Sequence, residues 1–358
     1  MTLRLRESLL LRPSDIAPSH EEWEVVGVFN PAVAVMDDEV VMLVRVAERP
    51  VPTSSGRVAL PRWQSTGDVT VDWFEDEDVQ PVDARVVATK PSGNLRLTSI
   101  SHLRVFRQSI KAPNGWRAAG GILPEADFEC FGLEDPRITN IDGTFWITYV
   151  AVSELGAVTA LLSSIDLVNF KRHGIIFPCE NKDVVLFPQK IDGGYLALHR
   201  PNPHSHFSPP SIWTAQSPDL LHWGRHAQLL GGRQSWERDR VGAGTPPILI
   251  DEGWLMLFHG SETSRVKGQV GCYTAGALLL DRHNPAQILA RSMSPTMAPT
   301  ASFETHGFVP NVVFPTALLD QGDTLAVYYG AADSCVGMAE FSKDAILQSM
   351  TIQGVPGR

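Results

Sequence analysis

Residues 134–150 read EDPRITNIDGTFWITYV and hold the pattern that decides the fold. A proline follows two carboxylates, an apolar run leads to Asp142-Gly143, and a second run rich in β-branched and aromatic residues comes after it. Asp-Gly between two such runs is a strong signal for a tight turn that joins two antiparallel strands. The stretch therefore predicts a β-hairpin.

The same pattern occurs five times along the chain, each copy with a proline, at positions 31, 136, 188, 247 and 315. Further strand-like runs between the copies are able to complete a sheet around each hairpin. Radial repetition of four-stranded sheets is typical of a β-propeller. We predict an all-β chain that folds as a five-bladed β-propeller with its active site in the central channel. The alternative is a β-sandwich or a mixed fold in which the hairpins are coincidental.

The repeat also changes how the length of 358 residues is interpreted. Length alone suggests two domains, whereas a closed ring of repeats predicts a single domain over residues 1–358. Residues 50–95 lengthen the spacing between the first two copies and contain an acidic run at 73–78. We predict that this segment is an insertion near the first blade that shapes one side of the site. For the acidic run, a solvated loop is the alternative.

Composition narrows the class of protein further. Of the residues 43% are hydrophobic, and 30 lysines and arginines stand against 40 aspartates and glutamates, for a net charge of -10. This balance disfavours nucleic acid as a partner, and no apolar run approaches the roughly 20 residues of a membrane helix. The first residues are too interrupted for a signal peptide, so we expect a cytoplasmic protein. The four cysteines lie far apart, which fits neither disulfides nor a structural zinc site.

Polar side chains stand at the hairpin positions that a propeller would direct to one end of its channel. They are Asn30, Asp135 and Thr245 beside the prolines, and Arg45, Tyr149, His199, Arg200, His259, Tyr328 and Tyr329 at the ends of the second strands. This arrangement predicts a polar, ligand-binding axis. Asp135 is a candidate general acid, with a pKa raised by burial and by its neighbour. A structural ion pair between Asp135 and Arg137 explains the motif equally well.

Basic residues gather at the hairpin ends of an otherwise acidic chain. They are Arg45, Arg172, Lys190, Arg200 and His259. A small anion such as phosphate is the ligand that this set favours, and separate surface ion pairs are the alternative. Asn181-Lys182-Asp183 and Trp236-Glu237 add the polar and aromatic groups that bind sugars. No ligand set at a firm spacing indicates a metal, so we predict no metal site.

With these motifs the sequence resembles glycoside hydrolase family 130, the β-mannoside phosphorylases and β-mannosidases. The resemblance covers most of the chain. Its most specific parts are FNPA at 29–32, GLEDPR at 132–137, NKD at 181–183, LFPQK at 186–190, HRP at 199–201, GAGTPP at 242–247 and YYGAAD at 328–333. The family fold is a five-bladed β-propeller with its site in the central channel. The segment LTSISHLR at 97–104 departs from the family pattern, which leaves the acceptor side open.

The resemblance implies a role for individual residues. Asp135 corresponds to the family's general acid, which is thought to protonate the leaving oxygen through a sugar hydroxyl. The positions that match the family's mannosyl-binding residues are Asn30, Arg45, His199 and Asp333. The positions at or near its phosphate-binding residues are Arg172, Lys190, His259 and Tyr273.

Three activities follow from these expectations. The first is inverting phosphorolysis of a β-mannoside, in which inorganic phosphate is the co-substrate, no other cofactor is needed, and the products are α-mannose 1-phosphate and a shortened sugar. The second is an inverting β-mannosidase, with Glu237 or Glu262 as the base that activates water. The third is a non-catalytic carbohydrate-binding propeller. Retention of Lys190, His259 and Tyr273 favours the first, while the linkage and a homo-oligomeric state are left open.

Overall fold

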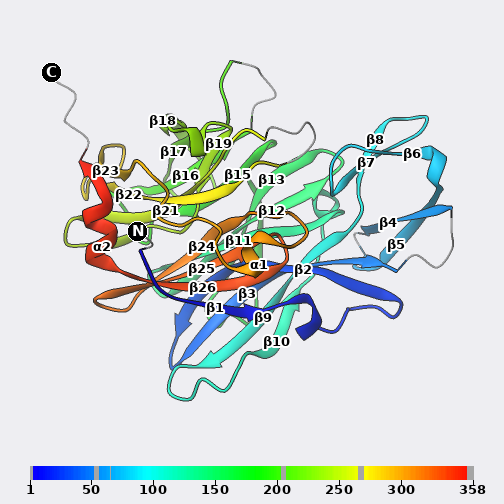
Figure 1. Ribbon diagram of the computed structural model, residues 1–358, viewed down its shortest axis with the longest axis horizontal. Helices are drawn as coiled ribbons and strands as arrows, with labels where there is room; N and C mark the ends of the chain where they lie inside the picture. Colours follow the sequence, from blue (N-terminus) through cyan, green and yellow to red (C-terminus); the bar gives the residue numbers. More distant parts are fainter. Residues whose placement is uncertain (1–2, 52–55, 65, 203–206, 265–269, 353–358) are drawn as a thin grey trace.

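The computed structural model describes residues 3–51, 56–64, 66–202, 207–264 and 270–352. Strands dominate these residues, as Figure 1 shows, and the predicted all-β class is confirmed. The helices are α1 (Ser302–Thr305), α2 (Lys343–Ser349) and the one-turn helices η1 (Pro13–Asp15), η2 (Asp76–Asp78), η3 (Asp127–Glu129) and η4 (Ser235–Glu237). Within the described ranges no helix has the length and apolar character needed to cross a membrane.

The largest sheet joins the first two hairpins. Its strands are β2 (Trp23–Met36), β3 (Glu39–Pro50), β9 (Ile100–Ser109), β10 (Arg117–Ile122), β11 (Gly132–Ile141), β12 (Thr144–Ser153), β13 (Gly156–Ser164) and β14 (Lys171–Phe177). Its halves meet where β11 runs parallel to β9, at the pair Gly132 and Ser101. Gly132 has φ 122°, and a Cβ there would lie 2.4 Å from the Ser101 carbonyl oxygen, so the junction requires glycine.

Three further large sheets follow. The first contains β15 (Asn181–Leu186), β16 (Tyr195–Pro201), β17 (Ile212–Ser217) and β18 (Gly224–Leu230). The second contains β19 (Arg240–Ala243), β20 (Ile248–Ile250), β21 (Gly253–Ser261), β22 (Tyr273–Leu280), β23 (Ile288–Ser292) and β27 (Met350–Ile352). The last contains β24 (Val313–Asp320), β25 (Thr324–Ala331), β26 (Cys335–Ser342) and the N-terminal strand β1 (Arg4–Leu11). Because β1 pairs with β26, the N-terminal strand completes a sheet whose other strands come from the C-terminal part of the chain.

All five predicted hairpins are present. The antiparallel pairs are β2 with β3, β11 with β12, β15 with β16, β20 with β21, and β24 with β25. The third copy differs from the predicted frame. Register shifts follow Glu134 in β11 and Lys182 in β15, so Asp183 and Val184 take the places of Asp135 and Pro136. Pro188 lies beyond the end of β15 and does not mark the repeat.

Apolar side chains fill the space between neighbouring sheets. Leu257 and Val327, both fully buried, belong to one cluster between the sheets of β21 and β25. Val185 and Trp254 belong to another, between the sheets of β16 and β21. Alternation along each strand sends every second residue into such a cluster, which fixes the register of the polar residues between them.

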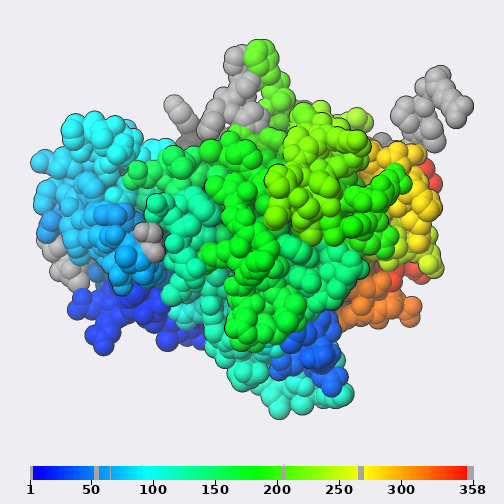
Figure 2. Space-filling view, turned by 180° about the vertical axis from the view of Figure 1, so that it is seen from behind, coloured from blue at the N-terminus to red at the C-terminus, as the bar shows by residue number. Residues whose placement is uncertain are grey.

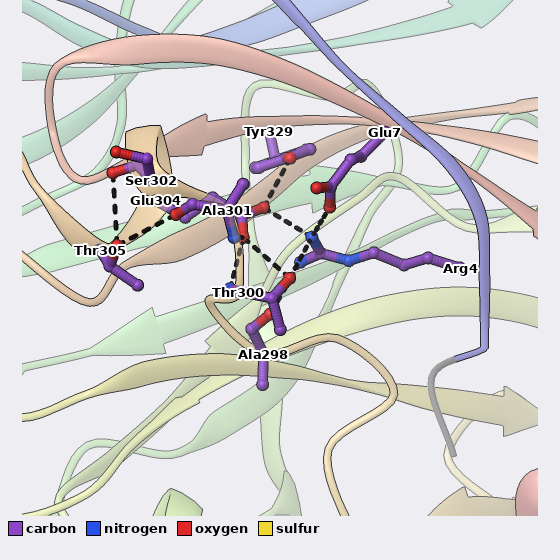
Figure 3. A network of polar contacts seen from close by, with 9 residues as sticks. All are labelled: Arg4, Glu7, Ala298, Thr300, Ala301, Ser302, Glu304, Thr305 and Tyr329. Carbon is purple, nitrogen blue, oxygen red and sulfur yellow. Dashed lines mark hydrogen bonds and ion pairs between the residues drawn. The ribbon is translucent and has the colours of Figure 1, made fainter.

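Three sheets are also held by buried glutamates, each paired with an arginine. We call these the glutamate clamps, and they are Glu129 with Arg172, Glu237 with Arg291, and Glu304 with Arg4. Each glutamate lies in a one-turn helix and also accepts two backbone N–H groups. Figure 3 shows the third clamp, in which the Tyr329 hydroxyl donates to Glu304 over 2.6 Å. Because Arg4 lies on β1, this clamp fastens the N-terminal strand to the C-terminal part of the chain.

The segment predicted as an insertion contains two small sheets between β3 and β9. They are the hairpin β4 (Arg57–Trp63) with β5 (Val69–Glu75), and the sheet β6 (Val79–Pro81), β7 (Val86–Thr89) and β8 (Asn94–Leu97). Arg96 joins them, because its guanidinium pairs with Asp72 at 3.0 Å and donates to the Leu60 carbonyl at 3.1 Å. Figure 2 shows the insertion as a lobe at one edge of the molecule.

Candidate active site

A central cavity of about 250 Å³ collects charged residues from all four large sheets and from the insertion. The polar residues that line it are Asn30, Arg45, Asp83, Arg85, Asp135, Lys182, Asp183, Arg200, Arg240, His259, Tyr273 and Asp333. Val309, Val312 and Phe314 form an apolar side of the same cavity. A larger depression of about 670 Å³ lies among outer turns and gathers none of these residues. The chemistry therefore belongs to the central cavity.

Bulges in the first strand of three hairpins present polar residues to the cavity. Asn30, Asp135 and Asp183 have φ values of 50°, 49° and 55°, in the left-handed region that asparagine and aspartate tolerate better than most residues. All three coincide with register shifts in β2, β11 and β15. A bulge re-aims a side chain that regular pleating would point elsewhere. The same local device thus supplies one polar group from each of three hairpins.

Asp135 lies in a buried hydrogen-bonded cluster. Its Oδ1 accepts from Asn30 Nδ2 at 2.7 Å and from Arg45 Nη1 at 3.0 Å, and Arg45 Nη2 also pairs with Glu134 at 2.6 Å. Burial acts to raise the pKa of Asp135, but Arg45 and the Asn30 hydrogen bond outweigh it and hold the pKa below its usual range. The raised pKa that was predicted for Asp135 is thus wrong, because the charge of Arg45 favours the ionised carboxylate in the free site.

Asp333 shifts in the opposite direction. Burial raises the pKa of Asp333, and the nearby negative charges of Asp135 and Glu134 raise it further against the opposing effect of Arg85 and Arg45. Among the aspartates that line the cavity, Asp135 and Asp333 therefore have pKa values that are pushed apart. Such pairs are typical of sites that move protons.

On the other side of the cavity, polar atoms of basic residues are buried without a hydrogen-bond partner. Asp183 accepts from Arg200 Nε and lies 3.3 Å from His259 Nε2, yet Arg200 Nη1 and His259 Nδ1 are buried without a partner. Lys182 lines the cavity, and burial lowers its pKa. Buried polar atoms normally have partners, so these atoms indicate a missing one. Several cationic donors around one space suit an anion.

His259 is neutral in the free site. Burial lowers its pKa to about 3, and Asp183 offsets this only in part. Its ring also packs against Phe314, with ring centroids 4.4 Å apart, which fixes its orientation. Tyr273 stacks on the same ring, with the two ring centroids 6.0 Å apart. Two aromatic side chains therefore hold the imidazole of His259 in place.

The structure brings six of the residues predicted from sequence to this cavity. They are Asn30, Arg45, Asp135, His259, Tyr273 and Asp333. Five others, His199, Arg172, Lys190, Glu237 and Glu262, are not among the residues that line it. Each of the five has a physical reason to lie elsewhere.

His199 is displaced by strand alternation. Arg200 lines the cavity, so its neighbour His199 faces the opposite side of β16. There it stacks on Phe177, with ring centroids 4.7 Å apart, and its Nδ1 lies 2.9 Å from Asn181 Nδ2. The place in the cavity that the sequence assigned to His199 is thus taken by the next residue, Arg200.

Two more of the predicted residues, Arg172 and Glu237, are members of the glutamate clamps. Arg172 donates to Glu129 at 2.7 Å and also pairs with Glu125, so it is not a free phosphate ligand. Glu237 is fully buried and accepts from Arg291 and from the backbone N–H groups of Arg233 and Gln234. A fully buried carboxylate that is held by these partners and does not line the cavity is not placed to activate water there.

The last two lie at the surface. Lys190 is exposed beside the turn 191–194, with its Nζ 4.9 Å from the Tyr195 ring centroid. Glu262 is exposed just after β21. The phosphate-binding role predicted for Lys190 and the base role predicted for Glu262 therefore gain no support from this geometry.

Sequence reasoning missed part of the cavity. Lys182 and Arg200 were noted as polar or basic residues, but Arg240, Asp83 and Arg85 had no motif to mark them. Arg200 could have been predicted as an alternative to His199, because neighbouring residues in a strand point to opposite faces and only one of the two can face the cavity. In the described part of the chain no group of three histidine, cysteine or acidic residues is arranged to hold a metal ion.

The chain is similar to known mannoside phosphorylases. The sequence profile of glycoside hydrolase family 130, described as β-1,4-mannooligosaccharide phosphorylase, matches residues 97–352. A β-1,2-mannobiose phosphorylase from Listeria innocua is 38% identical over 357 residues, 98% of each chain. A 1,2-β-oligomannan phosphorylase from a Thermoanaerobacter species is 37% identical over 60% of this chain and 70% of its own. The solved complex of the Listeria innocua enzyme with β-1,2-mannobiose matches with a TM-score of 0.87, over 95% of this chain and 96% of that one.

Proposed function

This chain belongs to glycoside hydrolase family 130, and from that premise we propose that it is a phosphorylase that cleaves a β-mannoside with inorganic phosphate and inverts the anomeric configuration. The observation that carries the proposal is the buried Arg200 Nη1, a donor without a partner, beside Lys182 in the central cavity. His259 Nδ1, an acceptor in the neutral ring whose Nε2 faces Asp183, is likewise unpartnered and can accept from the hydroxyl of hydrogenphosphate. They lie in the same small space as the Asp135 cluster, so an anion and a sugar ring would meet there.

The fold part of the proposal is a closed five-bladed propeller. Residues from all five hairpins line the central cavity, and a second cavity of about 300 Å³ is lined by Val33, Ile138, Pro188, Ile248 and Leu318, again one or more from each hairpin. Two cavities that each touch every hairpin support a ring around one axis. The pairing of β9 with β11 joins the first two blades at their edges.

The reaction assigns each side of the cavity a task. Asn30, Arg45 and Asp333 hold the mannosyl unit, while Lys182, Arg200 and His259 hold phosphate, assisted by Arg240 and Tyr273. An oxygen of hydrogenphosphate forms a bond to C1, the bond from C1 to the glycosidic oxygen breaks, and the proton of hydrogenphosphate ends on the released hydroxyl. Asp135, ionised in the free site, takes up this proton and delivers it. Cations that position an anionic nucleophile replace the base that hydrolysis would need.

Hydrolysis is the second candidate, but its two predicted bases do not line the cavity. Glu237 is held in a clamp and Glu262 is exposed. A purely binding role leaves the pair of oppositely shifted carboxyls, Asp135 and Asp333, without a purpose.

The test is the dependence of turnover on phosphate. We expect β-1,2-mannobiose to be consumed only when phosphate is present, with mannose 1-phosphate as a product. Equal release of mannose in phosphate-free buffer would point to hydrolysis. If neither this sugar nor β-1,4-mannobiose is consumed in either buffer, the binding role is favoured.

The cytoplasmic location stays a prediction. It suits the proposed reaction, because a charged sugar phosphate crosses a membrane at high free-energy cost and is retained where it forms. Cell fractionation with an antibody to the chain measures it.

A further inference from the structure

Arg85 reaches the central cavity from the insertion, on the loop between β6 and β7. Asp83 Oδ1 accepts from the backbone N–H of Arg85 at 2.7 Å and of Val86 at 2.8 Å. The Arg85 carbonyl in turn accepts from the backbone N–H of Thr98 at 2.9 Å. The loop is therefore fixed on both sides of Arg85, although it belongs to a segment outside the repeated hairpins.

The guanidinium of Arg85 is surrounded by charge but has no direct partner. Among the described residues it makes neither a side-chain hydrogen bond nor an ion pair within 4.0 Å. Burial lowers its pKa, and the negative charges of Glu134, Asp333 and Asp135 raise it by more, so Arg85 is firmly cationic. A guanidinium has five N–H donors in a planar fork, and here they are free for a ligand.

Arg85 also stands between two cavities. A side cavity of about 570 Å³ lies between the insertion and the sheets of β12 and β15, and it shares Asp83, Arg85, Lys182 and Arg240 with the central cavity. Its remaining walls include Asn94 and Leu95 of β8 on one side, and Asn202 at the end of β16 on the other. The carboxylates Glu134 and Glu154 also line this cavity, and together with the amides and the short apolar face they suit a neutral sugar better than a second anion.

We propose that the side cavity binds the acceptor part of the mannoside, beyond the bond that is cut, and that Arg85 is the residue that binds the first acceptor unit. The inference rests on the proposed function. The central cavity of about 250 Å³ is below the roughly 300–1,000 Å³ of ordinary ligand pockets, so it suits one ring and phosphate, and the rest of the substrate needs further space. The side cavity supplies that space at the boundary where Arg85 lies.

The reverse reaction tests this, because it separates the two halves of the substrate. With α-mannose 1-phosphate as donor and mannose as acceptor, we expect Arg85→Ala to raise the KM for mannose about tenfold or more, as expected for lost hydrogen bonds to a charged group. The KM for mannose 1-phosphate should stay within about twofold of the wild-type value. Arg85→Lys keeps the charge but not the planar fork of donors, so its KM for mannose should lie between those of the wild type and Arg85→Ala.

Arg57→Ala is the matched control. Arg57 lies on β4 of the same insertion and pairs with Glu75 at 3.2 Å, but lines neither cavity. It should leave both KM values unchanged. An unchanged mannose KM in Arg85→Ala, or a parallel rise in both constants, overturns the inference.

Failure of the proposed function has a different signature. If the wild-type chain makes no disaccharide from mannose 1-phosphate, the phosphorylase proposal fails, and calorimetric binding of β-1,2-mannobiose still tests Arg85. Binding about tenfold weaker in Arg85→Ala than in Arg57→Ala supports the acceptor role, and equal binding contradicts it.

Discussion

At the scale of single residues, Asp135 and Asp333 show how one small space treats two carboxyl groups differently. Arg45 and Asn30 lie against Asp135 and favour its charge, whereas the half-buried Asp333 has no side-chain partner among the described residues. A lowered folded pKa contributes stability above the unfolded value, and a raised one removes stability there. Opposite effects on folding therefore follow from the same chemical substitution at the two positions.

Asp333→Asn should stabilise the protein and weaken its activity. At pH 7 the folded state must keep a carboxylate whose pKa is raised, and the amide removes that penalty. We expect the free energy of unfolding at pH 7 to rise by about 1 kcal/mol, with the gain shrinking as the pH falls through the raised folded pKa and gone below the unfolded pKa near 3.9. Urea denaturation at several pH values measures it. A loss of stability at neutral pH would contradict the assignment.

Asp135→Asn should destabilise the protein and abolish most turnover. The ion pair with Arg45 contributes stability above the unfolded pKa, and this contribution is lost as the pH falls through the lower folded pKa. Loss of the proton carrier should cut turnover about a hundredfold or more. Circular dichroism checks folding, and steady-state assays with phosphate check turnover. A folded variant with wild-type turnover removes Asp135 from the mechanism.

At the scale of strands and clamps, alternation and bulges decide which polar residues face the cavity. Motif matching identified the hairpins and six residues of the site, because those features are local in sequence. It chose His199 over Arg200 and assigned Arg172 to phosphate, because strand facing and the partner of a charged residue depend on distant segments. Glu129 and Arg172, for example, meet only once η3 and β14 are in place.

Lys182 and Lys190 test whether the family motif or the geometry of the cavity identifies the lysine that binds phosphate. Lys182 lines the central cavity, whereas Lys190 is exposed over Tyr195. We expect Lys182→Ala to raise the KM for phosphate at least about tenfold, because it removes a charge-assisted hydrogen bond to the anion. Lys190→Ala should leave the KM for phosphate unchanged. Initial rates over a phosphate titration measure both. The reverse order of effects would restore the assignment made from sequence.

Arg172→Ala should act on stability and not on phosphate. It removes the partner of Glu129, which is fully buried, and leaves that charge with only the Tyr149 hydroxyl and backbone donors. We expect the free energy of unfolding to fall by about 2–4 kcal/mol, because removal of one partner of a buried ion pair leaves the charge of Glu129 buried without its counterion. The KM for phosphate should match wild type. Denaturation and a phosphate titration on the same preparation decide between the two roles.

At the scale of the whole molecule, the repeated hairpins form the scaffold, and the insertion adds residues such as Arg85 that the hairpins do not provide. Five hairpins were readable from prolines, turns and β-branched runs, since each is complete within a short stretch of chain. Arg85 was not readable, because it lies in a segment with no counterpart in the repeat and reaches the cavity only through the packing of β6, β7 and β8. The net charge of -10 makes the cationic half of the cavity more distinctive still.

The most direct test of the central claim is the identity of the first sugar product. Phosphorus and proton NMR of the reaction of β-1,2-mannobiose with phosphate should show α-mannose 1-phosphate and free mannose forming in equal amounts from the start. A β-configured sugar phosphate would contradict inversion. Two equivalents of free mannose without any sugar phosphate would contradict phosphorolysis itself.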